Sequence, residues 1–116
     1  MIAIVLTALV ALLHFYFLVL EMFLWDKPMG RKVFNTTPEF ATASKTLAAN
    51  QGLYNGFLVA GLVWGLLLGA AGKPVLIFFL GCVIVAGVFG AATVNKRIFF
   101  VQAVPALLAL GALLMG

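Results

Sequence analysis

Hydrogen-bonding side chains are concentrated in one short, otherwise apolar part of this sequence. Asn50, Gln51, Tyr54 and Asn55 occur within six consecutive positions. Residues four apart are neighbours on a helix surface, so a helix here would place Asn50 beside Tyr54 and Gln51 beside Asn55. The stretch therefore predicts a polar helix face that binds a ligand, with Tyr54 as a candidate proton donor. The alternative is that these amides only join helices to one another through hydrogen bonds.

Two ionisable side chains, His14 and Glu21, interrupt the first apolar segment. On a helix, a separation of seven residues places them on nearly the same face, about 10.5 Å apart along the axis. Because a charged group inside a membrane costs about 2.5 to 3.5 kcal/mol, each needs a partner or a water-filled cavity. In one interpretation Glu21 faces into the helix bundle as a proton acceptor or as the counter-ion of a cationic group. In the other it lies at the membrane surface and reaches toward the basic residues that follow it. His14 is either a hydrogen-bonded core residue or a ligand-binding group.

Arg97 and Gln102 add polar groups near the start of the last apolar segment, and Arg97 is a candidate anion-binding group. The predicted ligand-binding residues are His14, Glu21, Asn50, Gln51, Tyr54, Asn55, Arg97 and Gln102. The candidate catalytic residues are Glu21, Tyr54 and Arg97. No metal site is predicted, because the sequence has no multi-histidine set and its single cysteine, Cys82, has no partner. The absence of a nucleophile elbow and of a phosphate-binding glycine loop disfavours hydrolases and kinases.

The composition indicates that the elements carrying these residues lie in a membrane. The chain has 116 residues, of which 66% are hydrophobic and 9% charged, and its mean hydropathy is +1.25. Such a composition leaves too few polar side chains to cover a soluble globule. The apolar segments also have the length of roughly 20 residues that a membrane-spanning helix needs. The net charge of +4 comes from scattered basic residues between those segments, a pattern typical of topology signals and not of a nucleic-acid interface.

These segments predict an all-α fold, a bundle of four transmembrane helices that forms a single domain over residues 1–116. The helices are expected at about residues 2–25, 45–71, 75–94 and 98–115, with a polar loop at about residues 26–44. The first and third connections hold six basic residues and the second holds only Lys73. The positive-inside rule therefore predicts a multi-pass protein of a bacterial inner (plasma) membrane with both termini outside. Polar residues from three helices would then meet in a cavity at the inner leaflet.

Three strings resemble the signature of a bacterial family of small membrane proteins known as domain of unknown function 1304. They are LVLEMFLW at residues 18–25, GRKVF at residues 30–34 and LAANQGLYNGFL at residues 47–58. The resemblance runs over nearly the whole chain. It implies a small membrane protein, and it names no reaction.

The layout also resembles, more distantly, the membrane-associated proteins in eicosanoid and glutathione metabolism (MAPEG). This resemblance implies four helices with outer termini, assembled as a homotrimer that binds glutathione between subunits. In that superfamily the second helix opens with a basic residue followed by an asparagine, and the fourth opens with an arginine. Lys45, Asn50 and Arg97 fall on those places, whereas the glutamate expected three positions after the asparagine is Leu53 here.

A second distant resemblance is to the haem-containing membrane epoxide isomerases, through the string LYNG at residues 53–56. In that pattern a histidine is expected upstream, and the corresponding position is Ala49. Haem would then depend on His14, which lies in a different predicted helix.

From these observations we expect a membrane protein whose inner polar cavity binds a small thiol or a lipophilic molecule between the subunits of a trimer. The alternative is a non-catalytic accessory or carrier protein whose polar cluster serves helix assembly. A haem-dependent, epoxide isomerase-like protein is a further alternative. The expected partners are the lipid bilayer and further copies of the chain, with glutathione or haem as the ligands that the two distant resemblances imply.

Overall fold

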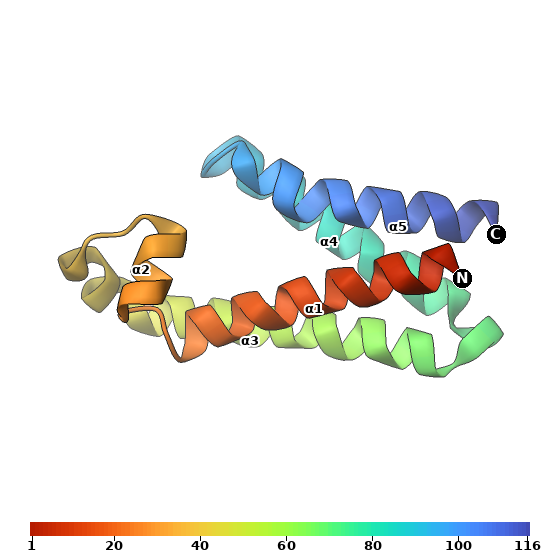
Figure 1. The fold of residues 1–116 in the computed structure, drawn as a ribbon, viewed down its shortest axis with the longest axis horizontal. Helices are drawn as coiled ribbons and strands as arrows, with labels where there is room; N and C mark the ends of the chain where they lie inside the picture. Colours follow the sequence, from red (N-terminus) through yellow and green to blue (C-terminus); the bar gives the residue numbers. More distant parts are fainter. The chain divides into compact units, whose positions relative to one another are not determined.

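The computed structural model describes all residues, 1–116, and they form helices and connecting turns without a strand (Figure 1). The five α-helices are α1 (Ile2–Met22), α2 (Pro28–Phe34), α3 (Pro38–Leu67), α4 (Lys73–Thr93) and α5 (Val104–Met115). A 3₁₀ turn, Gly69–Gly72, precedes α4, and a π-helical turn, Phe99–Ala103, precedes α5. The prediction of an all-α fold is therefore confirmed.

The structure corrects the predicted polar loop at about residues 26–44, because most of that segment is helical. Proline is favoured in the first turn of a helix, where its missing N–H is not needed, and Pro28 and Pro38 begin α2 and α3. The hydroxyl of Thr37 accepts a hydrogen bond from the Phe40 N–H at 3.1 Å and so caps α3. Asn35 ends α2 in the left-handed conformation, with φ of 55°. Pro28, Asn35 and Pro38 thus mark helix ends and not a continuous loop.

Two helical segments, Ile2–Met22 and Gly69–Thr93, are long and apolar enough to cross a membrane by length and composition. The segment Phe99–Met115 is apolar but shorter. The prediction of four crossing helices is therefore supported here for two of them, and the count of four remains a prediction.

The chain divides into two compact units. The first unit comprises residues 1–12 and 58–116, and the second comprises residues 13–57. The first unit has an apolar core contributed by α1, α3, α4 and α5. Its buried members are Val10, Ala11, Leu62, Leu76, Leu80, Val83, Ala106 and Ala109.

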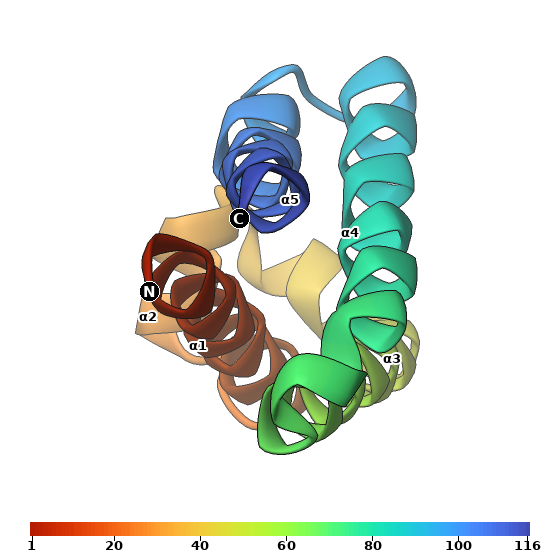
Figure 2. The same cartoon turned by 90° about the vertical axis from the view of Figure 1, so that its right-hand side faces the viewer.

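Within the first unit, α4 and α5 lie side by side (Figures 1 and 2). Gly87 permits the close approach of α4 to the π-helical turn, since a Cβ there would lie 2.7 Å from the Ala103 Cβ. Pro105 lies two residues after the end of the π-helical turn and has no N–H for the carbonyl four residues earlier. A local π-helical adjustment is one way in which a membrane helix accommodates the bond that proline lacks.

Within the second unit, the end of α1 packs antiparallel against the beginning of α3, and α2 lies beside them (Figure 1). Gly52 and Gly56 are the contact points on α3. A Cβ at Gly52 would lie 3.1 Å from the Glu21 Cβ, and one at Gly56 would lie 3.0 Å from a Leu18 methyl group. This close approach brings the polar side chains of α1 and α3 within hydrogen-bonding distance.

Candidate functional site

A hydrogen bond between Glu21 and Asn55 is the centre of the polar region in the second unit. The Asn55 Nδ2 donates to the Glu21 Oε1 at 2.5 Å. Asn55 is only 6% exposed, and Glu21 is half-buried at the end of α1. The carboxylate therefore bonds to an amide on the facing helix, and it forms no ion pair with the basic residues that follow α1.

The other three polar side chains of the predicted cluster point away from this contact. Asn50, Gln51 and Tyr54 are all exposed, and their side chains form no hydrogen bond within the chain. The ring of Tyr54 contacts Phe57, with ring centroids 6.1 Å apart. The predicted polar face is thus divided, because Asn55 points into the helix contact and the other three side chains face outward.

His14 is completely buried in α1. Its ring meets the ring of Phe17 edge-on, with centroids 5.9 Å apart. Seven residues before it on α1, Thr7 is also completely buried, and its hydroxyl has no hydrogen-bond partner. The sequence reasoning missed Thr7, although the seven-residue spacing of Thr7, His14 and Glu21 would have revealed one polar stripe along the helix.

Arg97 and Gln102 belong to the first unit. Arg97 is exposed, and its backbone N–H donates to the Asn95 Oδ1 at 2.8 Å, just before the π-helical turn. Gln102 is half-buried within that turn. A cavity shared by these two residues and the polar groups of α1 and α3 remains a prediction.

Two further polar contacts, which the sequence reasoning did not anticipate, join the end of α1 to α3. The Trp25 Nε1 donates to the Ser44 Oγ at 3.0 Å, and the Ser44 hydroxyl donates to the Phe40 carbonyl at 2.7 Å. The Lys45 Nζ lies 3.2 Å from the Asp26 Oδ2. Trp25 and Lys45, the residue at which the second helix was predicted to begin, therefore also position α3.

The ion pair makes stability depend on pH in a defined direction. The hydrogen bond from Lys45, together with the charges of Lys45 and Lys27, lowers the pKa of Asp26 below its ordinary value of 3.8. A lowered folded-state pKa stabilises the fold above pH 3.8, and this contribution is lost as the pH falls through the lowered value. We therefore expect Asp26→Asn to lower the unfolding temperature at pH 7 and to leave it unchanged near pH 2. Thermal melts of the parent protein and the variant in a non-ionic detergent at pH 7 and near pH 2 measure the two unfolding temperatures. A difference in unfolding temperature that is equal at both pH values would contradict the prediction.

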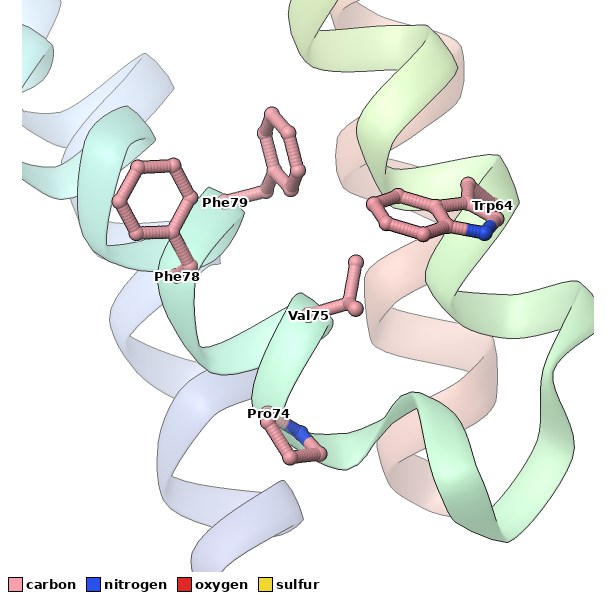
Figure 3. A pocket seen from close by; sticks show the side chains of 5 residues that line it. All are labelled: Trp64, Pro74, Val75, Phe78 and Phe79. Carbon is pink, nitrogen blue, oxygen red and sulfur yellow. The ribbon is translucent and has the colours of Figure 1, made fainter.

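Shallow apolar depressions lie on the first unit and do not involve the predicted polar residues. One is lined by Trp64, Pro74, Val75, Phe78 and Phe79, at the turn between α3 and α4 (Figure 3). Another follows the exposed side of α4 from Ile77 to Phe89. Neither is the polar cavity expected from the sequence. No group of three or more His, Cys, Asp or Glu side chains is placed to hold a metal ion.

Comparisons with known proteins give matches over nearly the whole chain. A family model described as "Protein of unknown function (DUF1304)" matches residues 8–114. A curated protein of Lactococcus lactis subsp. lactis (strain IL1403), described as "Uncharacterized protein YpaA", is 36% identical over 109 residues. The match covers 92% of this chain and 92% of that protein. No solved structure matches the chain.

Proposed function

Because the chain belongs to the DUF1304 family of proteins of unknown function, its function has to come from its own geometry, and we propose that it binds a small molecule in a membrane. The binding surface is the outward polar face of α3, formed by Asn50, Gln51 and Tyr54. The observation that carries the proposal is that these three side chains are exposed and form no hydrogen bond within the chain.

Membrane insertion is supported by the exposed side chains as well as by the two long apolar helices. Large apolar groups cover the outside of α1 and α4, among them Leu12, Phe15, Phe78 and Phe89, each more than half exposed. Lipid is the solvent that accepts such a surface, since soluble monomers rarely expose large contiguous apolar patches. We propose a multi-pass protein of the bacterial inner membrane with both termini outside, crossed by α1, the apolar half of α3, α4 and α5.

In that setting the unpaired amides of α3 need partners from outside the chain. Asn55 is already bonded to Glu21, so it is not the residue that recruits a ligand. Amides at a helix surface in lipid are satisfied by a second helix or by a bound polar group. We propose that further copies of the chain, most simply a trimer as in MAPEG proteins, enclose this face. The polar group bound there belongs to a thiol such as glutathione or to a lipophilic molecule, with haem as a less favoured ligand.

The Glu21–Asn55 bond favours a second candidate function, that of a non-catalytic accessory or carrier protein. Two of the predicted site residues already join α1 to α3 through this hydrogen bond. If Asn50 and Gln51 form hydrogen bonds to neighbouring copies of the chain in the same way, the whole polar cluster serves assembly and no ligand is needed.

Native mass spectrometry of the protein released from lipid nanodiscs tests the first proposal, because it reports subunit number and retained ligand together. We expect a trimer that carries a small-molecule mass, either retained or added as glutathione. Tyr54→Phe should lower the ligand-bound fraction by about tenfold, since it removes one hydrogen-bonding group.

The chain offers a matched control in its other tyrosine. Tyr16 on α1 is 45% exposed and Tyr54 is 48% exposed, so Tyr16→Phe makes the same chemical change at equal exposure. It should leave the ligand-bound fraction unchanged. A bare oligomer that Asn50→Leu dissociates would support the assembly function instead.

A further inference from the structure

The short helix α2 is held firmly to the second unit by two of its residues. Gly30 is buried, and a Cβ there would overlap the Leu24 carbonyl oxygen. Phe34 packs its ring on Trp25, with centroids 4.9 Å apart, and on Phe17, with centroids 6.4 Å apart. The side chains of α2 that do not make these contacts are therefore presented in a defined orientation.

Three basic side chains lie on α2 or directly before it, and all three are unpaired. Lys27 and Lys32 are exposed and Arg31 is half-buried, and none of the three forms an ion pair. The acidic groups of the same unit do not neutralise them. Asp26 is paired with Lys45, Glu21 is bonded to Asn55 inside the unit, and Glu39 is exposed without an ion pair.

The end of α2 also contains two buried polar atoms without partners, the Arg31 Nε and the Thr36 Oγ1. The chain brings these two residues together, because the Thr36 N–H donates to the Arg31 carbonyl at 3.0 Å. The left-handed Asn35 between them donates its own N–H to the same carbonyl. A buried donor without an acceptor costs about 1 to 3 kcal/mol.

Favourable interaction with the helix dipole explains why basic residues stand in the last turn of α2, but it does not satisfy these two atoms. A guanidinium N–H donates, and a hydroxyl can donate as well as accept, so an oxyanion that reaches both atoms would satisfy the pair. Lys32 supplies further positive charge on the adjacent position. Phosphate is an oxyanion that arginine binds strongly, often through two parallel hydrogen bonds.

We propose that Arg31, Lys32 and Thr36 bind the phosphate group of an anionic phospholipid. The occupant is a lipid because apolar side chains border the basic groups on α2. Met29 is 55% exposed and Val33 is 38% exposed, and both suit the boundary between headgroups and acyl chains. This site shares no residue with the polar face of α3, so its test does not depend on the ligand proposed there.

The test is a titration of the full chain in neutral detergent, with bound lipid counted by native mass spectrometry. The probes are dioleoylphosphatidylglycerol, dioleoylphosphatidylcholine and inorganic phosphate. We expect phosphatidylglycerol to bind at least about tenfold more tightly than phosphatidylcholine, because the zwitterionic lipid carries its own compensating cation. Arg31→Gln should remove this preference and Thr36→Val should reduce it.

Lys73→Gln is the matched control, since Lys73 is an exposed basic residue at the start of α4 in the other unit. It should leave the preference intact, whereas an equal loss in this variant would show diffuse charge attraction and overturn the site. Equal binding of the two lipids would also overturn it. Competition by inorganic phosphate at concentrations equal to the lipid would overturn the lipid as occupant. If Arg31→Gln does not fold, Lys32→Gln, which changes an exposed side chain, replaces it. This variant is expected to weaken the binding of phosphatidylglycerol and to leave the binding of phosphatidylcholine unchanged.

Discussion

Replacing Asn55 by leucine is expected to lower the free energy of unfolding by about 1 to 3 kcal/mol. Leucine has a similar size, but it cannot donate to the Glu21 carboxylate, whose partner is the Asn55 amide. The half-buried carboxylate would then lose its hydrogen bond without regaining full hydration. Unfolding of the purified protein in mixed micelles, followed by circular dichroism, measures the change.

Two comparisons separate the hydrogen bond from general effects of the substitution. Asn50→Leu makes the same change at an exposed position of α3, so it should alter the stability of the detergent-solubilised chain by less than about 0.5 kcal/mol. Removing both partners, in Glu21→Leu with Asn55→Leu, should recover most of the lost stability, because no carboxyl group is left without a hydrogen-bond partner. Equal losses for Asn50→Leu and Asn55→Leu would contradict the division of the polar face.

Replacing Gly30 by alanine is expected to destabilise the protein by about 3 kcal/mol, at the upper end of overpacking effects. The added methyl group would overlap the carbonyl oxygen of Leu24 and approach the Trp25 Cα at 3.1 Å. Both obstacles are backbone atoms, so no change of rotamer can relieve the overlap. The helix α2 must therefore move away from the end of α1, which also separates Phe34 from Trp25.

The fluorescence of Trp25 reports this movement directly when Trp64, the other tryptophan, is replaced by phenylalanine. In that background Gly30→Ala should change the emission of Trp25 and lower the unfolding midpoint. Gly81→Ala is the control, because a Cβ at Gly81 meets nothing within 4 Å. Alanine is about 1 kcal/mol better than glycine inside a helix, so this control should be neutral or stabilising. A similar loss in both variants would show that the Gly30 contact is unimportant.

Much of the secondary structure could be predicted because it depends on local sequence and solvent preference. Apolar runs of membrane length, bounded by proline, glycine and basic residues, placed α1 and α4 close to their observed bounds. The same reasoning failed between residues 26 and 44, where helices begin at Pro28 and Pro38. A helix of seven residues has no stability of its own in water, so it cannot be predicted from its local sequence alone. The contacts of Gly30 and Phe34 with the end of α1 are what stabilise it.

The sequence by itself determined that four polar side chains cluster on α3 and that His14 and Glu21 share one face of α1. Only the tertiary structure decided which of the clustered residues faces inward. Positions four apart on a helix differ by about 40° around its axis, so Gln51 and Asn55 are nearly equivalent in sequence terms. The close approach of α1 at Gly52 and Gly56 sets the rotation of α3, and it buries Asn55 against Glu21 while leaving Gln51 exposed. That rotation depends on packing between segments distant in the chain, and local periodicity does not contain it.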